Sequence, residues 1–267
     1  SFLRSEKLQT HIRYLLEKGA MYRVCNGNLL YHGCIPMEPD GSFTRVTMGD
    51  KTYFGKSLMD ACDRLCRTAM YDRRMENTDL LWYLWCGPYS PLNGKDKIAT
   101  FERTFLDDPE ARTEQKNPYY DLWNSGETAR TILTEFGVDF ERGHIINGHV
   151  PVRKTKGDTP IKANGKFINI DGGLSKAYQP VTGICGYTLV YSSHELYLAE
   201  HQPFDPDTAA RESADVLSRT IMIEQYPDRL RVRDTDGGAD VERRIADLKK
   251  LLAAYRSGLV RTPSRME

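Results

Sequence analysis

Three short apolar segments of this chain each end in a histidine or an aspartate beside glycine. Residues 23–31 lead into His32-Gly33, residues 144–146 lead through Asn147-Gly148 to His149, and residues 167–170 lead into Asp171-Gly172. Their length and apolar content predict β-strands. The end of a strand is a rigid mount, and a neighbouring glycine lets a ligand or the backbone approach closely. We therefore expect these three polar residues to be candidates for a functional site.

The two histidines have matching surroundings. Each is a candidate ligand for a divalent cation, because neutral imidazole binds borderline metal ions well. The alternative for His32 and His149 is a structural role in hydrogen bonding. Asp171 is a candidate partner for the second ring nitrogen of a metal-bound histidine, a common arrangement around metal sites. Its alternative is a turn aspartate before two glycines.

Helical and strand-like patterns occupy separate stretches of the chain. Apolar residues recur at helical spacing over 1–18, 56–70, 127–136 and 241–255, and strand-like segments cover 44–53, 144–146, 167–170, 186–191 and 196–199. Asn164-Gly165 between two apolar runs predicts a hairpin. Residues 88–125 predict a long ordered loop region. The order of these elements predicts an α/β (α+β) fold with a helical and aromatic insert at about residues 55–137.

The predicted domains are a larger part over residues 1–204 and a C-terminal helical segment over 205–267. Within that segment, the apolar residues Val241, Ile245, Leu248, Leu252 and Tyr255 follow a 4, 3, 4, 3 spacing. Such a stripe seats a helix on an apolar surface. We expect that surface to be the chain's own core or a neighbouring subunit of a homo-oligomer.

Composition excludes several classes of protein. The chain has 37 basic and 37 acidic residues, and this zero balance argues against a general nucleic-acid-binding protein. Its longest apolar run, residues 80–86, is far shorter than the roughly 20 residues of a membrane span. Six cysteines without a Cys-x-x-Cys pair predict reduced thiols in a cytoplasmic protein.

Basic and hydroxyl side chains gather after the third strand. Residues 175–179 include Lys176 and Tyr178, and Lys162 and Lys166 add positive charge nearby. Lysine and arginine are the usual partners of phosphate, so this region is a candidate phosphate-binding loop. The weaker candidates are Arg73, Arg74, Lys95 and Lys97. The alternative is solvated surface charge. The chain contains none of the P-loop, GxGxxG, GxSxG and HExxH motifs.

The two histidine motifs resemble those of the calcineurin-like metallophosphatases. His32-Gly33 is similar to their late His-Gly-Gly motif, and Gly148-His149 is similar to their final Gly-His motif. The likeness is closest to class III fructose-1,6-bisphosphatase of bacteria and covers residues 1–260. It is carried by residues 5–9, 26–36, 82–85, 100–103, 116–120, 143–151, 160–166, 170–179, 182–189 and 201–204.

This resemblance implies part of a calcineurin-like β-sandwich flanked by helices and lacking its N-terminal strands. It also implies a Mn²⁺-dependent hydrolase of gluconeogenesis, which removes the 1-phosphate of fructose 1,6-bisphosphate. By the same resemblance, His32 and His149 are catalytic residues and ligands of one ion of a dinuclear Mn²⁺ site. The residues expected to bind the sugar bisphosphate are Lys176, Tyr178, Lys166 and Arg74.

The chain departs from the family pattern in one respect. The earlier ligand motifs of these phosphatases (Asp-x-His, Gly-Asp-x-x-Asp and Gly-Asn-His-Asp/Glu) do not occur in it. We therefore expect a fragment whose metal site is completed by residues outside the chain and which is inactive alone. Two alternatives stay open. One is a different calcineurin-like phosphatase, such as a protein phosphatase or a dinucleoside polyphosphate hydrolase, and the other is a non-catalytic regulatory or scaffold domain.

Overall fold

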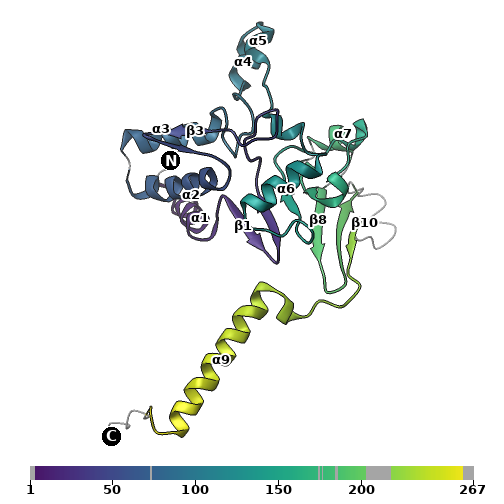
Figure 1. The fold of residues 1–267 in the computed structure, drawn as a ribbon. Helices are drawn as coiled ribbons and strands as arrows, with labels where there is room; N and C mark the ends of the chain where they lie inside the picture. Colours follow the sequence, from purple (N-terminus) through teal and green to yellow (C-terminus); the bar gives the residue numbers. More distant parts are fainter. Residues whose placement is uncertain are drawn as a thin grey trace. The chain divides into compact units, whose positions relative to one another are not determined.

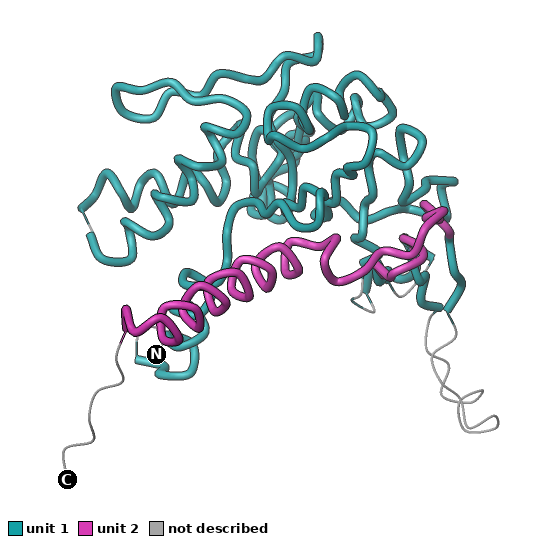
Figure 2. Tube along the Cα trace, turned by 60° about the horizontal axis from the view of Figure 1, so that its bottom comes forward, with its two compact units in different colours: residues 1–189, 198–221 teal, residues 190–197, 222–267 magenta. Residues whose placement is uncertain are grey.

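The computed structural model describes residues 4–72, 74–173, 175, 177–183, 186–202 and 218–260. It shows a mixed α/β protein. The chain divides into two compact units, which are residues 1–189 with 198–221 and residues 190–197 with 222–267 (Figure 2). The predicted domain boundary between residues 204 and 205 lies outside the described residues. Within the described ranges, no helix is long and apolar enough to cross a membrane.

A five-stranded mixed sheet lies at the centre of the larger unit. Its strands, in sheet order, are β1 (Tyr22–Cys25), β2 (Asn28–Tyr31), β5 (Ile145–Asn147), β7 (Phe167–Asn169) and β6 (Ile161–Lys162). The three middle strands run parallel, with Leu30 opposite Ile146 and Ile146 opposite Ile168, while β1 and β6 pair antiparallel at the edges. Parallel strands are normally buried on both faces. That accounts for the nearly continuous apolar runs of β2, β5 and β7.

Helices and a second hairpin make up much of the rest of the larger unit (Figure 1). They are α1 (Glu6–Lys18), β3 (Val46–Met48), β4 (Lys51–Tyr53), α2 (Gly55–Tyr71), α3 (Met75–Cys86), α4 (Thr100–Phe105), α5 (Pro109–Arg112), α6 (Gly126–Glu135) and α7 (Gln179–Thr182). Leu58 of α2 and Ile132 of α6 belong to the same buried cluster as Leu29 and Ile145 of the sheet. Burial of this apolar surface stabilises the larger unit. Helices α4 and α5 lie at the end of a projection (Figure 1).

The remaining strands are β8 (Gly186–Tyr191), β9 (Glu195–His201) and β10 (Ser218–Gln225), which form a three-stranded sheet in the order β10-β9-β8. They are followed by α9 (Asp236–Arg256). The apolar stripe predicted for this helix does lie on a helix. Its residues from Val241 to Tyr255 are 42% to 64% exposed. The surface that covers them, own core or neighbouring subunit, stays a prediction.

Several sequence-based expectations need correction. Residues 23–31 form two strands, because Asn26 and Gly27 both adopt positive φ and turn the chain back on itself. The predicted helical segment 205–267 contains strand β10, whose Thr220, Ile221 and Ile223 favour extended backbone. Residues 88–125 are not a simple loop region but hold α4 and α5. The Asn164-Gly165 hairpin between β6 and β7 is confirmed.

The described cysteines are free thiols, as the sequence predicts, and Cys185 lies outside the described residues. Burial raises the pKa of Cys34 and of Cys62 to about 12. A thiol with such a pKa stays protonated at neutral pH and is a poor nucleophile. These cysteines therefore act as small core residues.

A turn at residues 90–93 crosses the chain directly after β2. The backbone N–H of Cys34 donates to the carbonyl of Pro91 at 3.0 Å. The hydroxyl of Ser90 accepts from the backbone N–H groups of Leu92 and Asn93 at 3.2 and 3.3 Å. A Cβ on Gly33 would lie 2.5 Å from the Pro91 carbonyl oxygen, so only glycine fits beneath this turn.

We expect Gly33→Ala to lower the free energy of unfolding by about 1–3 kcal/mol, because the new methyl group would push the 90–93 turn away. Gly126→Ala is the matched control, since a Cβ at Gly126, in the first turn of α6, meets nothing within 4 Å. That control should leave stability unchanged or raise it by up to about 1 kcal/mol. Urea unfolding of both variants measures the difference. Equal midpoints for Gly33→Ala and the unsubstituted chain would contradict the close approach.

Candidate functional site

The three candidate residues meet at one edge of the central sheet. His32 directly follows β2, while His149 and Asp171 each lie two residues beyond the ends of β5 and β7. Because these strands are parallel, their carboxyl ends lie side by side. The backbone N–H of Gly148 donates to the carbonyl of His32 at 2.9 Å, and that of Val152 donates to the carbonyl of Asp171 at 2.9 Å. Main-chain hydrogen bonds thus tie the three strand ends together.

The two imidazole rings face each other. Nε2 of His32 lies 3.0 Å from Nδ1 of His149, and the ring centroids are 4.9 Å apart. The other ring nitrogen of His149, Nε2, lies 2.9 Å from the carbonyl oxygen of Asn93. A carbonyl oxygen only accepts, so Nε2 of His149 carries a proton and its Nδ1 is bare. The hydrogen bond between the rings therefore runs from Nε2–H of His32 to Nδ1 of His149.

The surroundings of His149 favour its neutral form. Burial is the largest effect that lowers its pKa, and the neighbouring His32 and Lys95 act in the same direction. The Asn93 carbonyl and Asp171 oppose the shift without cancelling it. A neutral imidazole with a bare nitrogen is the form that binds a metal ion.

We tested whether the pair could hold a metal ion. Two ring nitrogens 3.0 Å apart point at one position, and a cation bound to both would take the place of the proton between them. Among the described residues, however, no three His, Cys, Asp or Glu side chains form a group that could hold a metal. The pair can supply two ligands at most, and metal binding by His32 and His149 stays a prediction.

A buried polar network connects the ends of β2 and β5 at this edge of the sheet. The hydroxyl of Tyr119 lies 2.5 Å from the hydroxyl of Tyr31, which ends β2, and accepts from the amide of Asn147, which ends β5, at 2.7 Å. Burial raises the pKa of both tyrosines well above the usual value, so both phenols stay neutral. The network fixes the ends of the two strands that carry the histidines.

Asp171 does not hold the second nitrogen of His149, because the Asn93 carbonyl lies there. Its carboxylate accepts from the backbone N–H of Gly173 at 2.9 Å, and its own N–H donates to the side chain of Asn169 at 2.9 Å. These are the contacts of a turn aspartate. The negative charge of Asp171 acts on His149 toward a higher pKa, against the larger effect of burial. A role for Asp171 toward a bound metal stays a prediction.

Two of the residues expected to bind substrate have other contacts. Lys166 precedes β7 and donates to the carbonyls of Glu141 and Gly143 at 3.0 and 3.3 Å, at the amino end of the strand. The histidines lie at the carboxyl ends of the strands, so Lys166 lies at the opposite end of β7, and its role toward substrate stays a prediction. The sequence pattern alone does not give strand direction.

Arg74 lies between α2 and α3, where its guanidinium pairs with Asp72 at 2.7 Å and Glu76 at 3.5 Å. These contacts are those of exposed surface charge.

Tyr178 is exposed and precedes α7, and a Cβ on Gly173 would meet it at 2.9 Å. It therefore lies beside the turn that contains Asp171. Lys176 lies outside the described residues.

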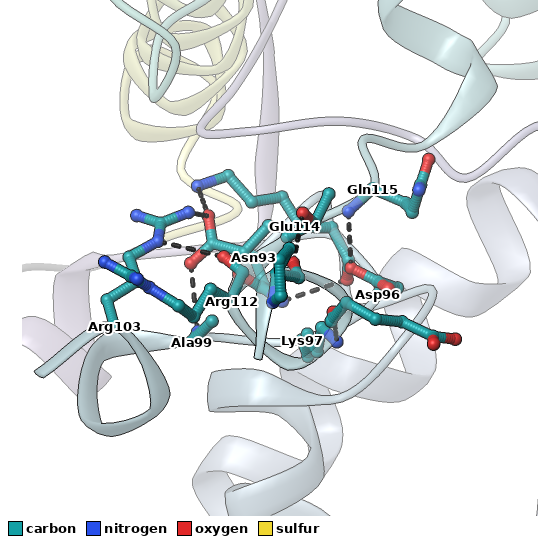
Figure 3. Close-up of polar contacts among 12 residues, drawn as sticks. Asn93, Asp96, Lys97, Ala99, Arg103, Arg112, Glu114 and Gln115 are labelled. Carbon is teal, nitrogen blue, oxygen red and sulfur yellow. Dashed lines mark hydrogen bonds and ion pairs between the residues drawn. The ribbon is translucent and has the colours of Figure 1, made fainter. Parts of the chain in front are cut away.

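Asn93 contributes to the site through a main-chain carbonyl, which no sequence motif can reveal. Lys95, two residues after Asn93, pairs with Glu114, which is the centre of a charged cluster. Figure 3 shows polar contacts around Glu114. The Glu114 carboxylate accepts from Lys95 at 2.7 Å and from the backbone N–H of Ala99 at 3.0 Å, and it pairs with Arg103 at 3.2 Å. Burial opposes ionisation of Glu114, but these partners outweigh it and lower its pKa.

Comparisons with known proteins show the family of the chain. The family described as Firmicute fructose-1,6-bisphosphatase matches residues 1–257. Two curated relatives named fructose-1,6-bisphosphatase class 3 are similar along nearly the whole chain. The one from Clostridium botulinum (strain Loch Maree / Type A3) is 51% identical over 267 residues, covering 98% of this chain and 40% of the relative. The one from Clostridium tetani (strain Massachusetts / E88) is 50% identical over 266 residues, covering 97% and 40%.

The chain thus combines a mixed α/β fold with two hydrogen-bonded histidines at the ends of parallel strands. The chain belongs to the Firmicute fructose-1,6-bisphosphatase family. It spans about two fifths of the length of the curated relatives that it matches. No solved structure matches it.

We expect Tyr119→Phe to lower the free energy of unfolding by about 1–3 kcal/mol, because it leaves the buried groups of Tyr31 and Asn147 without their shared partner. Tyr120→Phe is the matched control. The Tyr120 hydroxyl is also buried, but it has no nitrogen or oxygen partner among the described residues. Urea unfolding should show a clearly smaller loss for the control. Equal losses would mean that the network adds nothing to stability.

Nitrogen-15 NMR of the imidazoles tests the tautomer of His149. At neutral pH we expect a neutral ring with its proton on Nε2, because the Asn93 carbonyl accepts there and burial lowers the pKa. Lowering the pH should protonate Nδ1 only below the usual pKa of histidine. A proton on Nδ1 at neutral pH would contradict the contact with Asn93.

Proposed function

We propose that the protein to which this chain belongs hydrolyses the 1-phosphate of fructose 1,6-bisphosphate, yielding fructose 6-phosphate and phosphate, a step of gluconeogenesis. Membership of the family supports this proposal, as does the naming of both relatives as fructose-1,6-bisphosphatase class 3. The single structural observation that carries it is the histidine pair, whose nitrogens converge at the edge of the sheet.

The proposed cofactor is Mn²⁺ in a dinuclear site of a calcineurin-like β-sandwich. Nε2 of His32 and Nδ1 of His149 would bind one of the ions, and residues outside this chain would supply the other ligands. When bound, such ions lower the pKa of water and stabilise charge on phosphoryl oxygens. The Asn93 carbonyl contributes by holding the imidazole of His149 with its bare nitrogen turned toward the site.

This division of ligands implies that the chain alone is inactive. The described residues contain no three-ligand group, and two imidazoles do not complete a metal site. Phosphate release from fructose 1,6-bisphosphate with Mn²⁺ should therefore be found in the longer polypeptide and not in this chain. Activity of this chain alone would mean that other residues hold the metal. Inactivity of both would favour another phosphorylated substrate or a non-catalytic domain.

We expect His32→Ala and His149→Ala, made in the longer polypeptide, to lower Mn²⁺-dependent phosphate release by more than about 100-fold and to reduce bound metal. His194→Ala is the matched control, because this histidine lies on an exposed turn before β9. Circular dichroism checks that the variants remain folded. Full turnover by either variant with added Mn²⁺ would exclude that histidine as a ligand.

A further inference from the structure

Three basic residues, Lys95, Lys116 and Arg153, belong to chain segments that lead to the segment of His149. Lys95 lies two residues after Asn93, whose carbonyl contacts the ring of His149. Lys95 and Lys116 face each other in an isolated antiparallel bridge, and the backbone N–H of Asn117 donates to the carbonyl of Gly94 at 3.0 Å. Two separate segments of the insert thus bring their lysines to the same place.

The third basic residue, Arg153, lies in the segment that follows strand β5 of the sheet. Arg153 lies four residues after His149 and directly follows Val152, whose N–H donates to the carbonyl of Asp171 at 2.9 Å. The positive charge of Arg153 acts on Lys116 and lowers the pKa of its ammonium. Lys116 and Arg153 are both solvent-exposed, so a ligand can reach them.

Within the described residues, the positive charge of this group is only partly balanced. Of the three, only Lys95 has a carboxylate partner, Glu114, within the described part of the chain. Lys116 lies 5.7 Å above the ring of Tyr120, and no carboxylate is within ion-pair distance of it or of Arg153 among the described residues. Although the side chain is reachable from solvent, partial burial of its ammonium lowers the pKa of Lys116, and repulsion from Arg153 and Lys95 adds to that effect.

Two acidic residues lie near enough to act on Lys116 without pairing with it. Asp121 and Asp158 raise its pKa, but the net shift is still downward. Asp158 is committed elsewhere, since it pairs with Lys162 at 2.7 Å. An anion placed between Lys116 and Arg153 would relieve the repulsion that these acids leave.

The shape of the donors favours phosphate. A guanidinium offers a planar fork of N–H groups and an ammonium a compact charge, a combination that suits the three oxygens of a phosphate monoester. A sugar bisphosphate has one phosphate at the reacting position and a second that must be held elsewhere. This argument rests on the proposed function, because it takes the histidine pair as the place of hydrolysis.

We propose that Lys116 and Arg153 bind the phosphate of the substrate that is not cleaved, and that Lys95 adds to the positive field there. The site selects bisphosphates over monophosphates, because only a bisphosphate can occupy the histidine pair and the two cations together. The expected roles of Lys166 and Arg74 toward substrate stay predictions beside it.

The test uses Lys116→Gln, Arg153→Gln and the double variant in the longer polypeptide. The measured quantity is the ratio of kcat/KM for fructose 1,6-bisphosphate to kcat/KM for p-nitrophenyl phosphate, which has one phosphate. Each single substitution should lower this ratio on the order of tenfold, mainly through KM for the bisphosphate. Lys116→Arg should restore most of it. The matched control is Arg142→Gln, which removes an exposed charge before β5, at the amino end of the sheet.

Binding of inorganic phosphate, measured by isothermal titration calorimetry, tests the phosphate site at Lys116 and Arg153 separately from the proposed hydrolysis of fructose 1,6-bisphosphate. The double variant should bind phosphate at least about tenfold more weakly than the unsubstituted protein and the Arg142→Gln control. Loss of phosphate binding in a protein that does not turn over fructose 1,6-bisphosphate would reject the proposed function and keep the site. Turnover with an unchanged ratio and unchanged phosphate binding in the double variant would overturn the site and keep the function.

Discussion

The parallel alignment of β2, β5 and β7 is the constraint on which the candidate site depends. Each strand is only three or four residues long, so its end is fixed by a few main-chain hydrogen bonds and by burial on both faces. With that alignment, residues more than a hundred positions apart in sequence meet at one edge. A shift of one strand by a single residue would turn its side chains to the opposite face and separate His32 from His149.

Hydrogen bonds between polar groups hold the strand ends and the ring of His149 in place. The network of Tyr31, Tyr119 and Asn147 joins the ends of β2 and β5, and each of its members is hydrogen-bonded. The 90–93 turn presents the carbonyl of Asn93 to the ring of His149. The insert of residues 55–137 thus takes part in the site: it supplies Tyr119, Asn93 and two of the three cations.

Some of this arrangement is readable in the sequence, and some is not. Apolar runs ending in His32-Gly33 and Gly148-His149 predict strand ends because strand burial and glycine leave a local signature. Strand direction leaves none, so Lys166 was grouped with residues at the other end of β7. The Asn93 carbonyl is equally hidden, because every residue has one. The turn at Asn26-Gly27 does have a sequence signal, the same one that predicts the Asn164-Gly165 hairpin, but the long apolar run around it favours one continuous strand.

His149 has a φ of 67°, in the left-handed region that residues with a side chain seldom occupy. Holding such a residue there costs about 1 kcal/mol, which glycine would largely avoid. A glycine at position 149 would relieve this strain, but it would also remove the hydrogen bonds of the ring to His32 and to the Asn93 carbonyl. The imidazole thus offsets part of the strain of its own backbone, and a more stable form of this protein that keeps the histidine needs stabilising substitutions at other positions.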